Sequence, residues 1–187
     1  MGFAVPWVIL VSIPSLASRE SKTTGEESEG RETLSIQSSS DISINVVTDG
    51  KAESMALESY ITGVVLAEMP AEFEQDALKA QAVVARTYAL RRLEQGGKHE
   101  NGPVCTDPNC CQGYRSPEQY ISRGGSAEDV AKIEKAVYDT AGQVLTYEGA
   151  LIEATYFSCS GGQTEDALAV WGADIPYLQS TTSPGEE

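Results

Sequence analysis

The spacing of apolar and polar residues predicts an α+β domain. Between residues 42 and 46, apolar residues alternate with polar ones, which indicates a half-buried strand, and residues 48–51 then predict a hairpin turn. Apolar residues at near-helical spacing predict a helix over residues 55–67. Pro70 ends that helix, because proline restricts the residue before it and has no N–H to donate.

The clearest helix is predicted over residues 74–93, where Ala, Leu, Lys, Gln and Arg predominate. Its apolar stripe has small side chains, which permit close approach of neighbouring backbone, so we expect a central Ala-rich helix packed on several sides. Another helix is expected over residues 127–140. Strands are expected over residues 144–147 and 151–157, joined by a turn at residues 148–150.

The N-terminal region predicts export from the cytoplasm. Residues 3–16 form an apolar run without a charged residue, and the first charge is Arg19. The run is short for a transmembrane helix, so residues 1–17 are expected to form a signal anchor or a cleavable signal peptide. Residues 18–40 are rich in Ser, Glu, Thr and Gly and are expected to be a disordered linker. The rest of the chain is then expected at the cell membrane, on its extracytoplasmic side.

The charge balance excludes some partners. The 28 acidic and 13 basic residues give a formal net charge of -15. Phosphate binding needs an excess of Lys and Arg, so nucleic acid is not expected as a partner. The same sign argues against adsorption to anionic lipid.

Residues 95–125 predict a long irregular loop that contains a His/Cys cluster. His99, Cys105 and Cys111 offer three soft ligands for Zn²⁺, with Cys110 competing with Cys111. A disulfide of Cys105 with Cys110 or Cys111 is an equal alternative from spacing alone, and His99 would then have no role. Loops of this length are usually functional or held by a ligand or a cross-link.

Three further segments contain candidate functional residues. Glu68 ends an apolar helix just before a proline, where partial burial favours the protonated form of a carboxyl and suits proton donation. Lys79 and Arg86 lie two turns apart on one helix face, near a buried stripe. The simpler alternatives are an exposed helix-end carboxylate and ordinary surface charges.

The last candidate segment is residues 156–165, where a strand runs into a Ser/Gly-rich turn followed by an acidic residue. Adjacent glycines expose backbone N–H groups that can hold a polar ligand, although a plain glycine turn is the more common case.

These segments occur in the same order in one family, and the chain resembles the stage II sporulation protein D family, of the sporulation/amidase-enhancer type. The resemblance covers roughly residues 42–184. It rests on these stretches: 55–65, Ala67-Glu68-Met69-Pro70, 77–82, Ala85-Arg86-Thr87-Tyr88, Cys105-Thr106-Asp107, 140–145, Ser160-Gly161-Gly162 with Thr164-Glu165, Val170-Trp171-Gly172 and Pro176-Tyr177-Leu178.

The resemblance implies a lytic transglycosylase that cleaves peptidoglycan between N-acetylmuramic acid and N-acetylglucosamine and leaves a 1,6-anhydro sugar. The residue that matches the catalytic glutamate is Glu68, which would act first as acid and then as base. The implied substrate is glycan strands whose stem peptides have been removed, during engulfment in sporulation. The implied partners are a cell-wall amidase and membrane-anchored engulfment proteins.

The resemblance also assigns binding residues and a metal. It implies substrate-binding roles for Lys79, Gln81, Arg86, Tyr156, Ser160 and Glu165. It implies a zinc ion bound by His99, Cys105 and Cys111, which either holds the loop or polarises a ligand. Family members continue beyond the point that matches Glu187, so residues 41–187 are expected to form a catalytic domain of this type that is truncated at its C-terminus.

Two other functions remain open at this point. One is a non-catalytic amidase enhancer with the same fold, which binds cell wall and stimulates a partner hydrolase. The other is a metal-held extracellular binding module. Convergence of Glu68, Lys79 and Arg86 on one cleft favours the enzyme, whereas scattered positions favour the enhancer.

Overall fold

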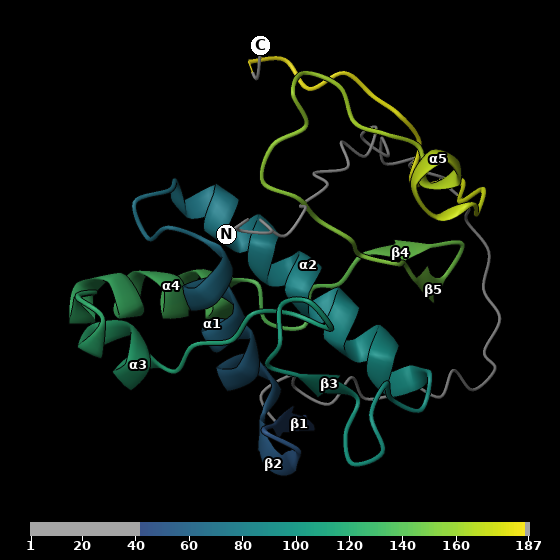
Figure 1. The fold of residues 1–187 in the computed structure, drawn as a ribbon. Coiled ribbons are helices and arrows are strands. Elements are labelled where there is room, and N and C mark those ends of the chain that lie inside the picture. The colour runs from purple at the N-terminus through teal and green to yellow at the C-terminus, as the bar shows by residue number, and fades with distance from the viewer. Residues whose placement is uncertain (1–41, 186–187) are drawn as a thin grey trace, which may run out of the picture.

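The computed structural model describes residues 42–185 (Figure 1). The expected signal segment (1–17) and linker (18–40) lie outside the described residues. Within the described part of the chain, no helix has the length and apolar character needed to cross a membrane.

The described chain begins with a hairpin. Strand β1 (Ser43–Thr48) pairs antiparallel with β2 (Lys51–Ala56), and a short third strand, β3 (Val104–Cys105), pairs parallel with β1. Asp49 and Gly50 form the two-residue turn with φ values of 50° and 76°, the left-handed geometry that suits the twist of a hairpin. The predicted strand and turn are therefore confirmed, and the sheet has the order β2-β1-β3.

Three helices pack together beside this sheet: α1 (Leu57–Glu68), α2 (Gln75–Glu94) and α4 (Ala127–Asp139). Figure 1 shows α2 running across the domain. Helix α2 also contacts β3 and residues 150–151, so the Ala-rich helix is packed on several sides, as expected. Helix α1 is more deeply buried than α2, because nine of the twelve residues of α1 are buried, against eight of the twenty residues of α2. It starts after Met55, which belongs to β2 and not to the helix predicted over residues 55–67.

Other predictions need correction. The loop expected over residues 95–125 contains β3 and a helix, α3 (Pro117–Ser122), which Ser116 begins with a capping box. The second late strand is much shorter than expected: β4 (Thr146–Tyr147) pairs only with β5 (Ala150–Leu151), and residues 152–157 are irregular. A short helix, α5 (Ala167–Trp171), was not predicted.

A buried ion pair joins the first turn of α1 to the middle of α2. The guanidinium of Arg86 is 0% exposed and donates to both carboxylate oxygens of Glu58, with Nη2 2.6 Å from Oε2. The same guanidinium donates to the carbonyls of Val137 and Gln143. Both charged side chains lie inside the protein, so Arg86 ties α1, α2 and the end of α4 together.

We expect Arg86→Met to lower the free energy of unfolding by about 3–5 kcal/mol, because it leaves the Glu58 carboxylate buried without its cation. Urea unfolding measures this change. Lys135→Ala is the control, since Lys135 forms an exposed pair with Asp139, and we expect its unfolding curve to overlay that of the wild type. Equal effects of the two substitutions would contradict the structural role of Arg86.

Candidate functional site

Glu68 is the last residue of α1, and its carboxylate is half-buried. The backbone N–H of Gly113 donates to Oε1 of Glu68 at 2.7 Å. The contact is close, because a Cβ at position 113 would lie 2.9 Å from the same oxygen and the carboxylate would have to shift to admit it. A negative charge at a helix C-terminus is disfavoured by the helix dipole, so the N–H from Gly113 offsets part of that cost.

The residues after Gly113 run along α1 and fix its C-terminal half. The backbone N–H of Arg115 donates to the carbonyl of Gly63 at 3.0 Å, and the Arg115 guanidinium donates to the carbonyl of Leu66 at 3.4 Å. The ring of Tyr114 covers Gly63, where a Cβ would meet the ring at 2.1 Å. Residues 113–115 therefore hold the end of α1 and the carboxylate at that end.

Tyr156 lies beside Glu68 and belongs to a second group of hydrogen bonds. The side chain of Gln112 donates to the Tyr156 hydroxyl at 3.4 Å and accepts from the Tyr60 hydroxyl at 3.4 Å. Burial raises the pKa of Tyr156 well above its ordinary value, and the negative charge of Glu68 raises it further. Tyr156 consequently stays protonated across the physiological range and can donate to the carboxylate.

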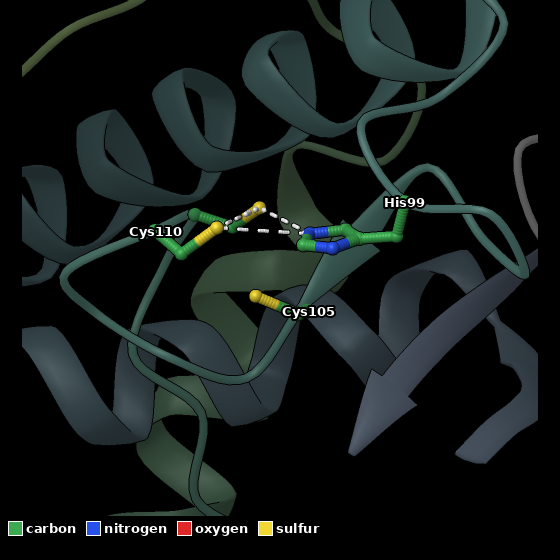
Figure 2. A group of neighbouring side chains, drawn as sticks. His99, Cys105 and Cys110 are labelled. Carbon is green, nitrogen blue, oxygen red and sulfur yellow. Dashed lines mark hydrogen bonds between the residues drawn. The ribbon is translucent and has the colours of Figure 1, made fainter. Parts of the chain in front are cut away.

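A cluster of His99, Cys105, Cys110 and Cys111 lies just before Gln112 in the sequence. Their donor atoms all lie within 4.8 Å of one another. Nε2 of His99 is 3.3 Å from Sγ of Cys111 and 3.8 Å from Sγ of Cys110. Figure 2 shows the ring of His99 and the thiols of Cys105 and Cys110 turned toward one another. The set could hold a metal ion, because imidazole and thiolate are ligands for soft transition metals.

The disulfide alternative is not seen, because all four cysteines of the chain are free thiols in the structure. Burial raises the pKa of the Cys105 thiol to about 12. Burial also opposes ionisation of Cys110, but hydrogen bonds from Cys105 and Lys98 outweigh it, and the pKa of Cys110 is lowered. A metal ion would have to displace the thiol protons, so its binding would weaken as the pH falls.

The three candidates on α2 do not join Glu68. Arg86 is in the core and saturated by its partners, so a glycan cannot reach it. Lys79 lies 3.4 Å from a carboxylate oxygen of Asp139 and 3.8 Å from one of Asp76. Gln81 is buried, and its side-chain nitrogen has no hydrogen-bond partner among residues 42–185. The structure thus gives Glu68, Lys79 and Arg86 separate surroundings.

The candidates from the Ser/Gly-rich segment line a different space. Ser160 and Glu165 border a cavity of about 390 Å³, together with Thr155, Phe157 and Trp171 among others. Thr155 and Phe157 flank Tyr156 in the sequence, so this cavity lies next to the segment that carries Tyr156 to Glu68. Tyr156 is the predicted substrate-binding residue that the structure brings to Glu68.

Sequence reasoning missed the residues that connect these parts. Gln112, Gly113 and Tyr114 were part of a loop without an assigned role, yet they contact Tyr156, Glu68 and Gly63. Their position directly after Cys111 was the available signal. A close backbone contact to a side chain far along the sequence leaves no pattern in hydrophobic spacing.

Comparison with known proteins settles the family. A family model described as stage II sporulation protein matches residues 48–147, which include Glu68 and the whole His/Cys cluster. The chain belongs to this stage II sporulation protein family.

Individual relatives agree with the family. The stage II sporulation protein D of Bacillus amyloliquefaciens is 39% identical over 168 residues, which cover 88% of this chain and 49% of that protein. The protein of the same name from Bacillus subtilis (strain 168) is 39% identical over 171 residues, which again cover 88% of this chain and 49% of that protein. An amidase enhancer from Bacillus subtilis (strain 168) is 38% identical over 118 residues, 63% of this chain and 14% of that protein. The chain thus spans about half the length of the two stage II sporulation proteins D.

Gly63→Ala tests the packing that holds the end of α1. Helix propensity alone favours Ala over Gly by about 1 kcal/mol, but the added Cβ would displace the Tyr114 ring. We therefore expect this substitution to destabilise the protein by about 1–3 kcal/mol in urea unfolding. Ser59→Ala, on the exposed side of the same helix, should be neutral or slightly stabilising. A gain in stability for Gly63→Ala would contradict the packing described here.

Proposed function

We propose that this protein is a peptidoglycan lytic transglycosylase with Glu68 as its catalytic acid and base. The observation that carries the proposal is the setting of Glu68: a half-buried carboxyl at a helix end, contacted by the Gly113 N–H and by a protonated Tyr156. General acid–base chemistry needs a carboxyl that is held in one position and exists in both protonation states during the cycle.

The reaction uses one carboxyl twice. Protonated Glu68 gives its proton to the oxygen that links C1 of N-acetylmuramic acid to the 4-position of N-acetylglucosamine, and the bond between C1 and this oxygen breaks. The 6-hydroxyl of the same muramic acid then attacks C1, and the Glu68 carboxylate takes the hydroxyl proton. The product is a 1,6-anhydro sugar, no water is consumed, and Glu68 is again protonated.

A single carboxyl is consistent with the surroundings of Glu68. Glu72 and Glu74, the next carboxylates in the sequence, are exposed. Ordinary glycosidases place two carboxyl groups across the scissile bond, whereas an internal hydroxyl nucleophile removes the need for the second. Hydrogen bonds from Gly113 and Tyr156 stabilise the carboxylate that forms after the first proton transfer.

Zinc is the metal that we propose for the His/Cys cluster. The donor set of one imidazole and several thiolates matches zinc sites, and the donor atoms are close enough to share one ion. When bound, zinc would cross-link the loop formed by residues 99–111. His99, Cys105 and Cys111 are the ligands that the family resemblance implies, and Cys111 precedes Gln112 and Gly113 directly.

The biological setting is proposed from the named relatives. Two relatives are named stage II sporulation protein D and one is named amidase enhancer, which supports a role in cell-wall remodelling during sporulation and engulfment. We propose glycan strands stripped of stem peptides as the substrate, and a cell-wall amidase and membrane-anchored engulfment proteins as partners. The N-terminal segment would place the domain at the outer face of the cell membrane.

A second function, the non-catalytic amidase enhancer, is favoured by one observation. Lys79 and Arg86 do not converge with Glu68, since Lys79 pairs with Asp139 and Arg86 is buried against Glu58. The absence of these two expected binding residues from the surroundings of Glu68 weakens the case for a substrate-binding cleft there. The enhancer would bind cell wall and stimulate a partner amidase without cleaving glycan itself, so product analysis separates the two functions.

Glu68→Gln tests the enzyme. Purified peptidoglycan, intact and stripped of stem peptides, is digested and the products are identified by mass spectrometry. We expect wild type to release 1,6-anhydro-muramic products from stripped strands and Glu68→Gln to release none, because an amide is too weak an acid to protonate the glycosidic oxygen and too weak a base to take the hydroxyl proton. Glu72→Gln, at an exposed carboxylate four residues on, should retain activity. Products from Glu68→Gln at the wild-type rate would exclude Glu68 as the acid, and no products from folded wild type would favour the enhancer.

Tyr156→Phe tests the hydrogen bond to the catalytic carboxyl. Loss of a hydrogen bond to a charged group costs about 1.5–3 kcal/mol, so we expect the rate to fall about 10- to 100-fold. Tyr138→Phe, at an exposed tyrosine, should leave the rate unchanged. A wild-type rate for Tyr156→Phe would remove Tyr156 from the site.

A further inference from the structure

The His/Cys cluster contains one more thiol than the zinc ligands that the family resemblance assigns. Cys110 was expected to compete with Cys111, but the structure brings both thiols to His99, with the two sulfurs 4.0 Å apart. The Cys105 thiol completes a group of four donors. We propose that Cys110 is the fourth ligand, which makes this a closed Cys₃His zinc site with no open coordination position. The proposal rests on the zinc that the proposed function includes.

The distances among His99, Cys110 and Cys111 match a tetrahedral site, and all four donor atoms, with that of Cys105, lie within 4.8 Å of one another. Zn–S bonds of about 2.3 Å and tetrahedral angles place two thiolates about 3.8 Å apart, and an imidazole nitrogen lies slightly closer to each sulfur. The measured separations among His99, Cys110 and Cys111 run from 3.3 to 4.0 Å. An ion held by three of the donors would therefore have the thiol of Cys110 within bonding reach, in the position that an open site leaves for water.

A tight turn explains how two adjacent cysteines point to the same centre. The backbone N–H groups of Cys110 and Cys111 both donate to the carbonyl of Asp107, at 3.0 and 2.8 Å. The carboxylate of Asp107 accepts from the backbone and side chain of Asn109 at 2.8 and 3.2 Å. In an extended chain the side chains of neighbouring residues point to opposite sides. Because residues 107–111 form a turn, the side chains of Cys110 and Cys111 can point to the same side.

A neighbouring cation offsets the negative charge that a third thiolate would add. Three thiolates and one Zn²⁺ leave a net charge of -1, which is unfavourable in a chain of net charge -15 unless a cation lies nearby. The ammonium of Lys98 donates to the carbonyl of Cys110 at the edge of the cluster. Lys98 precedes His99, so the cation is supplied by the same loop as the ligands.

A closed site decides between the two roles that the sequence left open for zinc. With four protein ligands, the ion has no free position at which to polarise a substrate or activate water. Its effect on Glu68 would pass through the chain from Cys111 to Gly113, whose N–H holds the carboxylate at 2.7 Å. The zinc is then structural, and residues 110–113 form the link between the metal and the proposed acid.

X-ray absorption at the zinc edge of the purified, zinc-loaded protein counts the ligands without reference to activity. We expect three sulfur ligands near 2.3 Å and one nitrogen near 2.0 Å. Two sulfurs with two lighter ligands would overturn the role of Cys110 while leaving the zinc proposal intact. A protein that binds no zinc would overturn both, and neither result depends on whether Glu68 is catalytic.

Cobalt substitution with Cys110→Ser provides the second measurement. The sulfur-to-cobalt charge-transfer absorption of the Co²⁺-loaded protein should fall by about one third, because two thiolates remain where three were bound. Cys159→Ser is the matched control, since Cys159 is exposed and lies outside the cluster, and its spectrum should equal that of wild type. An unchanged spectrum for Cys110→Ser would refute the proposal.

Discussion

The hydrogen bond from the Gly113 N–H to Glu68 joins the two halves of the proposed site. On one side it fixes a carboxylate at the C-terminus of α1, where the helix dipole disfavours negative charge. On the other side it is the end of a segment that begins at the His/Cys cluster. A Cβ at position 113 would crowd this carboxylate at 2.9 Å. The His/Cys cluster, the path of residues 111–115 and the position of the Glu68 carboxylate are therefore linked through one continuous segment.

Buried contacts fix both ends of helix α1. Helix α1 is enclosed by α2 and α4, and the Arg86–Glu58 pair fixes its first turn as residues 113–115 fix its last. A helix held at both ends keeps Glu68 in one place, which general acid–base chemistry requires. Arg86 thus supports the position of Glu68 from within the core, whereas Tyr156 and the adjoining cavity lie on the side of the proposed site.

Local patterns predicted the parts of this fold that depend on local chemistry. The Asp49-Gly50 turn, the helix end near Pro70 and the Ala-rich helix all follow from residue preferences, and the structure agrees. The strand expected through residue 157 was wrong, because β5 pairs only across its turn and has no further partner strand within residues 42–185. The partners of Arg86 and Glu68 lie 28 and 45 residues away in the sequence. Only the folded chain reveals such contacts.

Hydrogen exchange at the Gly113 amide tests the central contact most directly, because it reports on the bond itself. The account predicts a protected Gly113 amide in wild type, and an exchange rate at least about tenfold higher in Glu68→Ala, from the loss of a charge-assisted hydrogen bond. The Arg115 amide, bonded to the Gly63 carbonyl, should exchange equally slowly in both proteins. Equal protection of Gly113 in wild type and Glu68→Ala would show that the carboxylate is not held by this bond and would contradict the account.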